Sequence, residues 1–381
     1  MLRSKQGATC ILLIVVALAG AKVPDGLDLK LLKALTTDLS KNQAIAPFVM
    51  STLVTQVWLG AVGDARNEIA SVLDIRTEEE QLVISYNRAI RSLSDSPSSV
   101  TTGVFNRIYI RRGFNINPVF KDILQYYYRS DVKNILSATQ AADEINTDVA
   151  KATRNRIKDL VSADALQEAV MVLVSALYFK GLWLTPFDKT VKEPFLTASG
   201  DKEVDMMKLF TRVPYVKMSS FDAIALPYKD KNYVMLILRP LTRNMAAVSR
   251  LRDSLDSLDV ADIMKRLRSL SVQISMPRFK ITASYELQET MSQLGIRTLF
   301  TAKADLFTIA DGPLTVSNII HKVFIEVTEK GTEAAGAGAV TIVSTSIRPP
   351  PIQFTADRPF FAIVWNKRHM INMFSVYMAS Q

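Results

Sequence analysis

The sequence predicts an α+β fold that is mostly helical in its first half and rich in strands after about residue 169. Residues 48–59 are apolar almost throughout and residues 78–93 carry apolar side chains at helical spacing, so both predict helices. Residues 170–179 and 362–365 are short apolar runs of the kind that forms buried strands. Strands and helices do not alternate with a regular strand–helix–strand period, which argues against a Rossmann topology.

The remaining elements follow from the same two patterns. Further helices are predicted at residues 27–39, 65–73, 118–127, 141–160, 246–270 and 284–294. Further strands are predicted at residues 102–110, 233–238 and 271–276. Neither a repeat nor a linker divides the chain, so we expect one domain over residues 22–381.

The composition is that of an ordinary globular protein. The chain has 381 residues, of which 48% are hydrophobic and 22% charged, and this range excludes disordered and collagen-like classes. Lys and Arg outnumber Asp and Glu by 46 to 37. The positive charge is spread along the chain instead of gathered in an arm or tail, so we expect no nucleic-acid partner.

The first 21 residues have the pattern of a secretory signal peptide. Arg3 and Lys5 precede an apolar run over residues 10–21, and the small residues at 19–21 predict cleavage after Ala21. The run is too short to span a bilayer, although an uncleaved anchor or a buried first helix is the alternative. We therefore expect a secreted, extracellular protein with no membrane association.

The single cysteine, Cys10, lies within this predicted signal peptide. The mature chain would then have no disulfide, no thiol nucleophile and no thiolate metal ligand. A secreted domain of this length can be stable without disulfides, because it buries most of its apolar surface.

Histidine is too scarce for most hydrolytic or metal chemistry. The only two, His321 and His369, belong to no HExxH or Cys/His cluster, and no glycine-rich phosphate loop is present. His321 lies in an apolar run at residues 319–325 and is predicted to be a hydrogen-bonded structural residue, whereas His369 is predicted in a turn between strands. We expect no metal, no cofactor and no enzymatic activity.

Residues 331–351 stand out between two predicted strands. Residues 331–339 hold almost only small side chains, residues 340–343 have strand propensity, and Pro349, Pro350 and Pro351 prevent regular pairing at the far end. A long loop inside a compact domain is usually functional or disordered. The composition suits a segment that is a loop in one state and a strand in another.

Several separated motifs resemble those of the serpin family, in the family's order and over residues 27–378. They are SALYFKGLW at 175–183, MPRFK at 276–280, HK at 321–322 with IEV at 325–327, EKGTEAA at 329–335 and DRPF at 357–360. The resemblance implies three β-sheets, eight or nine helices and an exposed reactive-centre loop. It also implies a monomeric inhibitor whose partner is a serine protease.

The resemblance places the reactive bond between Thr345 and Ser346. The family's scissile residue lies sixteen positions after a hinge glutamate, here Glu329, and in several members nine positions before a phenylalanine that matches Phe354. Threonine at this position favours proteases with a small primary pocket, an elastase-like class. The alternative, Arg348, would indicate a trypsin-like target, but Pro349 follows it.

The implied mechanism is insertion of the hinge into the main sheet after the protease has attacked. The hinge comprises Glu329, Lys330, Gly331, Thr332, Glu333, Ala334, Ala335, Gly336, Ala337 and Gly338. In a strand, alternate side chains share a face, and the set Thr332, Ala334, Gly336 and Gly338 is small at every step. Non-inhibitory relatives often carry bulky or charged residues there, so a serpin-fold binding or carrier protein is the alternative function.

The resemblance also assigns two support regions around the main sheet. Trp183 and Arg278 match the breach, where the hinge enters, and an ion pair between Arg278 and Glu329 is expected. Ser175 and His321 match the shutter below it. Family members usually have hydroxyls and an asparagine around this histidine, but here the matching residues are Ala46, Val49 and Ser175, so we expect an imidazole short of partners. A glycosaminoglycan partner is a further hypothesis, with the candidates Arg88, Arg91, Arg107, Arg111 and Arg112.

Overall fold

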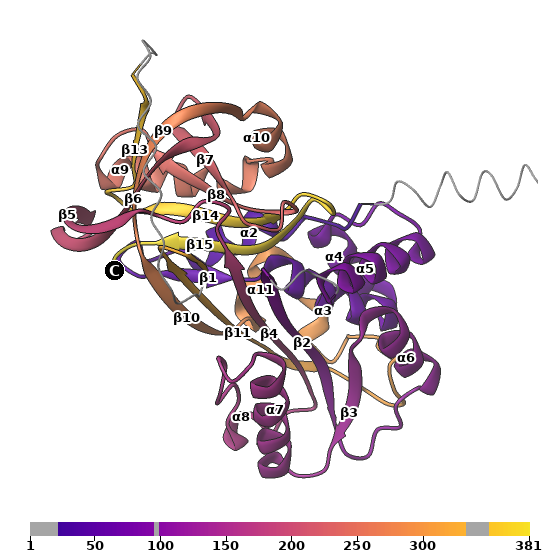
Figure 1. Cartoon of the computed structure of the whole chain (residues 1–381). Coiled ribbons are helices and arrows are strands. Elements are labelled where there is room, and N and C mark those ends of the chain that lie inside the picture. The colour runs from indigo at the N-terminus through magenta and orange to yellow at the C-terminus, as the bar shows by residue number, and fades with distance from the viewer. Residues whose placement is uncertain (1–21, 95–98, 333–349) are drawn as a thin grey trace, which may run out of the picture.

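The computed structural model describes residues 22–94, 99–332 and 350–381. The predicted signal peptide, the hinge from Glu333 onward and the predicted reactive bond lie outside these residues. In the described part, the first half supplies most of the helices and the second half most of the strands (Figure 1). The predicted α+β class is confirmed.

Ten α-helices occur in the described residues, slightly more than the eight or nine expected. They are α2 (Asp28–Leu35), α3 (Pro47–Gly60), α4 (Gly63–Leu73), α5 (Glu79–Ser94), α6 (Pro118–Ile123), α7 (Ala138–Ala152), α8 (Ala163–Gln167), α9 (Met245–Asp253), α10 (Val260–Arg266) and α11 (Gln288–Leu294). A π-helical turn, η1 (Leu124–Tyr128), continues α6, and short 3₁₀ turns are η2 (Leu255–Ser257) and η3 (Thr298–Phe300). Among these described helices, none combines the length and the hydropathy needed to cross a membrane.

A six-stranded sheet forms the long face of the molecule (Figure 1). Its order is β10 (Phe279–Glu286), β11 (Val316–Thr328), β12 (Gly331–Thr332), β4 (Met171–Leu182), β2 (Val100–Arg111) and β3 (Asp131–Ile135). The central pair, β4 and β11, is parallel and directly bonded as far as Tyr178 and Phe324. Beyond that point the two-residue strand β12 lies between them, antiparallel to both.

The other strands form one nine-stranded sheet, where the family resemblance implied two separate ones. They are β1 (Gln43–Ile45), β15 (Ile371–Met378), β14 (Phe360–Asn366), β8 (Tyr233–Pro240), β7 (Phe221–Pro227), β6 (Gly200–Lys217), β9 (Arg268–Pro277) and β13 (Ile352–Thr355), with β5 (Lys189–Thr197) paired to β6. The strand β6 is 18 residues long and bonds to β7 near its end and to β9 along most of its length. This long strand joins the second and third strand sets.

Two apolar layers cover the six-stranded sheet. Helix α3, buried along almost its whole length, packs against both β4 and β15 and so fills the space between the two sheets. On the opposite face, α7 packs on Phe105 and Tyr109 of β2 in a smaller apolar cluster. Successive residues of β2 therefore point alternately toward α3 and toward α7.

Two predicted helices are shorter than the sequence pattern suggested. Residues 246–270 form α9, a 3₁₀ turn and α10, and residues from Arg268 onward already belong to β9. A new helix starts at Val260 because the Asp259 side chain caps it, accepting from the N–H groups of Ala261 and Asp262. The predicted helix at 141–160 ends at Ala152, and Arg154 and Asn155 then adopt positive φ values, a left-handed backbone that a helix cannot continue through.

A buried ion pair connects β7, β8 and β13. The Asp222 carboxylate accepts from the Arg239 guanidinium, which also donates to the Thr355 carbonyl at 3.0 Å and lies 4.3 Å from the centre of the Phe354 ring. The side chains of Asp222 and Arg239 are 3% and 10% exposed. Removing one partner would leave the other charge buried without compensation.

We predict that Asp222→Ala lowers the free energy of unfolding by about 3 to 5 kcal/mol, because an unpaired buried guanidinium is costly. The matched control is Asp201→Ala, which removes the half-exposed partner of Arg243 and should cost less than about 1 kcal/mol. Urea unfolding curves of the three proteins measure both differences. Equal losses in the two variants would contradict the buried pair's importance.

Candidate functional site

The first residues of the predicted hinge lie inside the six-stranded sheet. Gly331 is in register with Leu182 and Thr332 with Gly181, so β12 occupies the space at the end of the β4–β11 pair. Thr332 is fully buried, and its hydroxyl lies 2.8 Å from that of Tyr228. This short strand is the point from which a longer strand could extend between β4 and β11.

Two glycines make this close approach possible. Gly331 has φ of +149°, and a Cβ there would lie 2.1 Å from the Gly181 carbonyl oxygen. A Cβ on Gly181 would lie 2.6 Å from the Tyr228 ring. Because real Cβ atoms do not approach other atoms so closely, a side chain at position 331 would push β12 away from β4, and one at position 181 would displace the Tyr228 ring.

Trp183 holds the turn that leads into the hinge. Its indole N–H donates to the Thr328 carbonyl at 3.0 Å, and its backbone N–H donates to the Lys330 carbonyl at 2.9 Å. The indole stacks on Tyr228, with ring centres 4.5 Å apart. The same two aromatic residues therefore contact the turn before β12 and the Thr332 side chain within it.

The expected ion pair between Arg278 and Glu329 is not formed. Arg278 pairs with the Asp205 carboxylate, which also accepts from Lys192 at 2.8 Å. The Glu329 carboxylate instead accepts from the Thr190 hydroxyl. Strand β6 brings Asp205 beside Arg278, which the sequence could not reveal because the two residues are 73 positions apart.

The Gln381 side chain also bonds to the backbone of Asp205 and Arg278. Its amide oxygen accepts from the Asp205 N–H at 2.6 Å, and its amide nitrogen donates to the Arg278 carbonyl at 3.1 Å. Arg278 is thus held by its side chain and by its backbone, without Glu329.

His321 has two partners, so the prediction of an under-bonded imidazole was wrong. The Ala46 N–H donates to Nε2 at 3.2 Å, which places the ring proton on Nδ1, and Nδ1–H then donates to the Ser175 hydroxyl at 3.0 Å. Ala46 lacks the hydroxyl common in the family, but its backbone replaces it. Burial lowers the pKa of His321 to about 3, so the ring is neutral at physiological pH.

The sequence analysis missed Asn106 as a member of this shutter group. Strand pairing aligns Asn106 of β2 with Ser175 of β4, and Ser175 with His321 of β11, in one polar row across three strands. The Asn106 amide donates to the Val49 carbonyl at 3.1 Å and so connects the sheet to α3. Only the register of the sheet brings these three residues together. The one sequence signal for Asn106 is that it is an asparagine within an otherwise largely apolar predicted strand.

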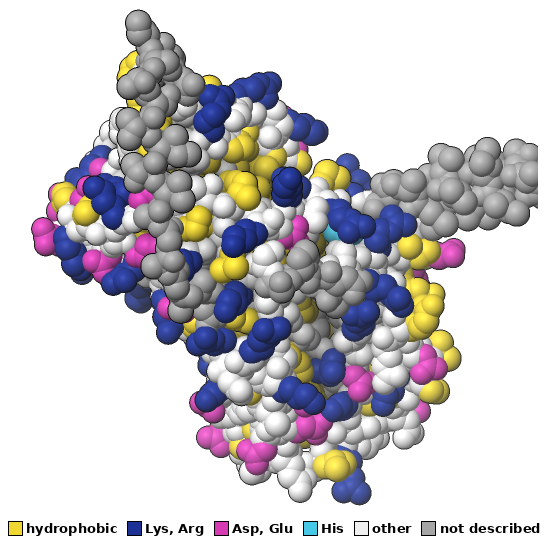
Figure 2. Space-filling model, viewed as in Figure 1, with side chains coloured by type: hydrophobic (Ala, Val, Ile, Leu, Met, Phe, Trp, Pro, Cys, Tyr) yellow, Lys and Arg dark blue, Asp and Glu magenta, His cyan; other side chains and the backbone are white. Residues whose placement is uncertain are grey.

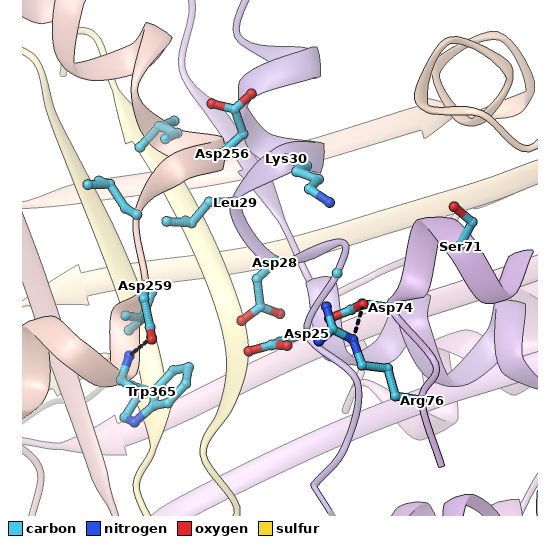
Figure 3. A pocket seen from close by; sticks show the side chains of 15 residues that line it. Asp25, Asp28, Leu29, Lys30, Ser71, Asp74, Arg76, Asp256, Asp259 and Trp365 are labelled. Carbon is cyan, nitrogen blue, oxygen red and sulfur yellow. Dashed lines mark hydrogen bonds and ion pairs between the residues drawn. The ribbon is translucent and has the colours of Figure 1, made fainter. Parts of the chain in front are cut away.

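A pocket of about 310 Å³ lies beside α2, away from the hinge. Its lining includes Asp25, Asp28, Asp74, Asp256 and Asp259, and the carboxyl groups of Asp25 and Asp28 face the same space (Figure 3). Burial, together with the neighbouring Asp25 charge, raises the pKa of Asp28 well above its usual range. Within the described ranges, no group of three or more His, Cys, Asp or Glu side chains is arranged to hold a metal ion.

Comparisons with known proteins agree with the motifs. The family model described as "Serpin (serine protease inhibitor)" matches residues 25–378. The chain belongs to the serpin family. It is 30% identical to Iripin-2 of Ixodes ricinus over 91% of this chain and 90% of the relative.

Solved serpin structures have the same fold. Serpin48 of the insect Tenebrio molitor is 26% identical, with a TM-score of 0.82 over 94% of this chain and 98% of that one. A native protease nexin-1 crystallised with heparin is 25% identical, also with a TM-score of 0.82, over 94% and 97% of the two chains. The predicted serpin fold is therefore confirmed.

The arginines considered for glycosaminoglycan binding do not form one patch in this serpin. Arg88 and Arg91 project from α5, whereas Arg107 lies on the α7 side of β2, where its guanidinium is 5.3 Å from the centre of the Phe105 ring. Arg111 and Arg112 are exposed at the far end of β2. Figure 2 shows Lys and Arg side chains scattered over the face in view. The glycosaminoglycan hypothesis stays a prediction for these five arginines.

We predict that His321 makes the serpin's stability depend on pH below about 6.5. Its pKa is depressed in the folded state, so the unfolded chain binds a proton that the folded chain does not, and stability falls as pH drops from about 6.5 toward 3. The contribution is about 1.4 kcal/mol per pH unit. Unfolding free energies of the native sequence and His321→Gln, measured from pH 7 to pH 4, should show a flatter curve for the variant.

The control is Ser175→Ala, which removes the partner of Nδ1 and keeps the imidazole. This variant should lower stability by a similar amount at each pH and retain the slope. A His321→Gln curve parallel to that of the native sequence would contradict the prediction.

Proposed function

We propose that this serpin is a secreted inhibitor that traps a serine protease by inserting its hinge into the six-stranded sheet. The observation that carries the proposal is the placement of Gly331 and Thr332 as a strand between β4 and β11. A chain that continued from Thr332 between these two parallel strands would run antiparallel to both of them. Insertion of the loop into the main sheet is the established behaviour of inhibitory serpins.

The chemistry before insertion is ordinary acyl transfer. The protease serine oxygen bonds to the Thr345 carbonyl carbon, the bond to the Ser346 nitrogen breaks, and the new amino group leaves with a proton. An ester then joins the protease to Thr345. Insertion must carry the protease away before water hydrolyses this ester, so the rate of insertion determines whether the serpin inhibits or is merely cleaved.

The hinge composition favours fast insertion. Thr332 already occupies a fully buried position, and strand alternation assigns Ala334, Gly336 and Gly338 to the same face of an inserted strand. Small side chains enter a closed sheet without overpacking it. For the inserted strand to lengthen past β12, the directly paired parts of β4 and β11 must separate. The hydrogen bond between His321 and Ser175 is one of the contacts that must then break.

Two features support the finer assignments of location and target. The basic and apolar pattern at residues 1–21 supports secretion. Thr345, with Ile342 and Val343 before it, suits a protease with a small primary pocket and apolar neighbouring subsites. An elastase-like enzyme is therefore the target we propose.

We predict that the secreted serpin forms a covalent complex with an elastase-like protease that survives boiling in detergent. The ester persists because the displaced catalytic residues no longer activate water. Its formation must also release the peptide from Ser346 to Gln381, which mass spectrometry identifies directly.

Two outcomes would contradict this assignment in different ways. A released fragment that begins at Pro349 would move the reactive bond to Arg348 and the target to a trypsin-like class. Cleavage without a stable complex, across a broad panel of serine proteases, would favour the binding or carrier function.

We predict that Thr332→Arg converts the inhibitor into a substrate. The guanidinium would have to enter the buried position beside Tyr228, and a desolvated charge costs several kcal/mol, so insertion becomes slower than hydrolysis of the ester. The stoichiometry of inhibition should rise from near one to well above it.

The matched control is Glu333→Arg, which puts the same side chain at the next position. Strand alternation assigns that position to the opposite face of an inserted strand, so inhibition should be largely retained. Full inhibition by Thr332→Arg would refute hinge insertion as the mechanism.

A further inference from the structure

Two loops of the nine-stranded sheet lie side by side at one end of β8 and β14. Residues 229–232 lie between β7 and β8, and residues 367–370 join β14 to β15. Strands β8 and β14 are paired neighbours, and the Lys367 N–H donates to the Asn232 carbonyl at 2.7 Å, so the two loops are in contact. We refer to residues 229–232 and 367–370 together as the hairpin surface.

The hairpin surface carries four exposed cations that form no ion pair or side-chain hydrogen bond with a residue that the structure describes. They are Lys229, Lys231, Lys367 and Arg368. The one carboxylate in the two loops belongs to Asp230, which is only 8% exposed and accepts from the Asn232 N–H at 2.9 Å. Asp230 therefore shapes its own loop. Like charges gathered on one surface repel one another, and an anionic partner would relieve this repulsion.

Helix α5 borders the hairpin surface through Arg88, which is exposed. Burial lowers the pKa of His369, and the charges of Arg368 and Arg88 lower it further. The guanidinium of Arg88 consequently acts on the β14–β15 loop from a different element. The positive potential of the hairpin surface thus extends toward α5.

The pocket beside α2 brings acidic side chains toward the same end of β14, because Trp365 belongs to its lining. Much of that acidic charge is balanced within the pocket region. Three of its five aspartates form ion pairs, Asp25 with Lys22, Asp74 with Arg76 and Asp256 with Lys33. These pairs use none of the four cations of the hairpin surface.

Met370 places an apolar side chain beside these cations. It is 43% exposed and has φ of +53°, in the left-handed region that a bulky residue rarely adopts. Such a conformation costs free energy, and backbone strain of this kind often marks a functional position. A thioether side chain is flexible and adapts to irregular apolar surroundings. The hairpin surface therefore combines an apolar tip with a group of unpaired positive charges.

We propose that the hairpin surface binds membranes that contain anionic lipids. The four cations lie at the level of the lipid phosphate and carboxylate groups, and Met370 enters the boundary of the acyl chains. Each cation near an anionic bilayer contributes about fivefold in affinity, and the buried apolar side chain adds to this. Binding does not depend on the serpin being an inhibitor. The proposal replaces the sequence-based expectation of no membrane association.

The apolar tip favours a lipid surface over a sulfated polysaccharide. Both partners offer negative charge to the four cations, but a polysaccharide has no hydrocarbon layer that Met370 could enter. The two partners therefore differ in what Met370 contributes. Affinity for membranes depends on this side chain, whereas affinity for heparin does not.

Cosedimentation of the purified protein with large vesicles tests the proposal. Vesicles of phosphatidylcholine alone are compared with vesicles that also contain about 30% phosphatidylserine, an anionic lipid. We expect binding to the mixed vesicles and none to phosphatidylcholine alone. Binding should decrease as the salt concentration rises, because salt screens the attraction between exposed charges.

Two double variants locate the contact. Lys367→Gln/Arg368→Gln should lower the partition coefficient on mixed vesicles about 25-fold, at about fivefold for each cation removed. The matched control, Lys151→Gln/Lys158→Gln, removes the same net charge from exposed positions in the last turn of α7 and just after it. Helix α7 lies across the six-stranded sheet from α3, so the control should change binding less than about twofold.

Met370→Asn isolates the apolar contribution. Asparagine tolerates a positive φ, so the unfolding midpoint should not fall. The affinity for mixed vesicles should decrease about tenfold, because an apolar side chain is no longer transferred from water into the bilayer. Retention on a heparin column should be the same as for the native sequence.

The proposal is overturned if the mixed vesicles do not bind the protein. It is also overturned if the two double variants lose affinity equally, because attraction would then follow net charge and not the hairpin surface. Full vesicle binding by Met370→Asn, together with lost heparin retention in Lys367→Gln/Arg368→Gln, would instead identify a site for sulfated polysaccharides.

Discussion

The hydrogen bond between His321 and Ser175 spans β11 and β4, the two parallel strands on which the rest of the molecule depends. The two strands pair directly on both sides of this bond, as far as Tyr178 and Phe324, and beyond these residues they are separated by β12. The sheet is therefore closed over part of its length and already open at one end. A closed sheet keeps the loop outside, and the open end provides the place where the loop can enter.

The chemistry of this bond makes it both stable and breakable. The Ala46 N–H selects the tautomer that lets Nδ1 donate to Ser175, so a single backbone contact from the segment before α3 sets the polarity of the connection. The ring is buried and neutral, because burial lowers its pKa to about 3. A neutral bond of this kind contributes only about 1 kcal/mol, far less than a buried ion pair would demand when broken. The strands can thus separate without leaving an uncompensated charge.

The entry point depends on sterics more than on charge. Gly331 allows the backbones of β12 and β4 to approach more closely than any side chain permits, and Gly181 leaves room for the Tyr228 ring. Trp183 and Tyr228 hold the adjoining turn and the Thr332 hydroxyl. The charged residues nearby are arranged differently from what the family resemblance suggested. Arg278 pairs with Asp205, and the Glu329 carboxylate accepts from the Thr190 hydroxyl, so among the described residues the hinge glutamate has no ionic anchor to the sheet.

The sequence by itself determined the fold class, the family and the chemical character of the hinge, because these are carried by local patterns. Apolar periodicity reveals buried helices and strands, and the small residues after Glu329 show their sizes directly. The strands β5 and β6 escaped notice, since their side chains alternate weakly and their stability comes from neighbouring strands. Only the tertiary structure decided which residues meet: Asn106 with Ser175 and His321, and Asp205 with Arg278. These contacts join residues far apart in the chain, and strand register, which no local pattern encodes, sets them.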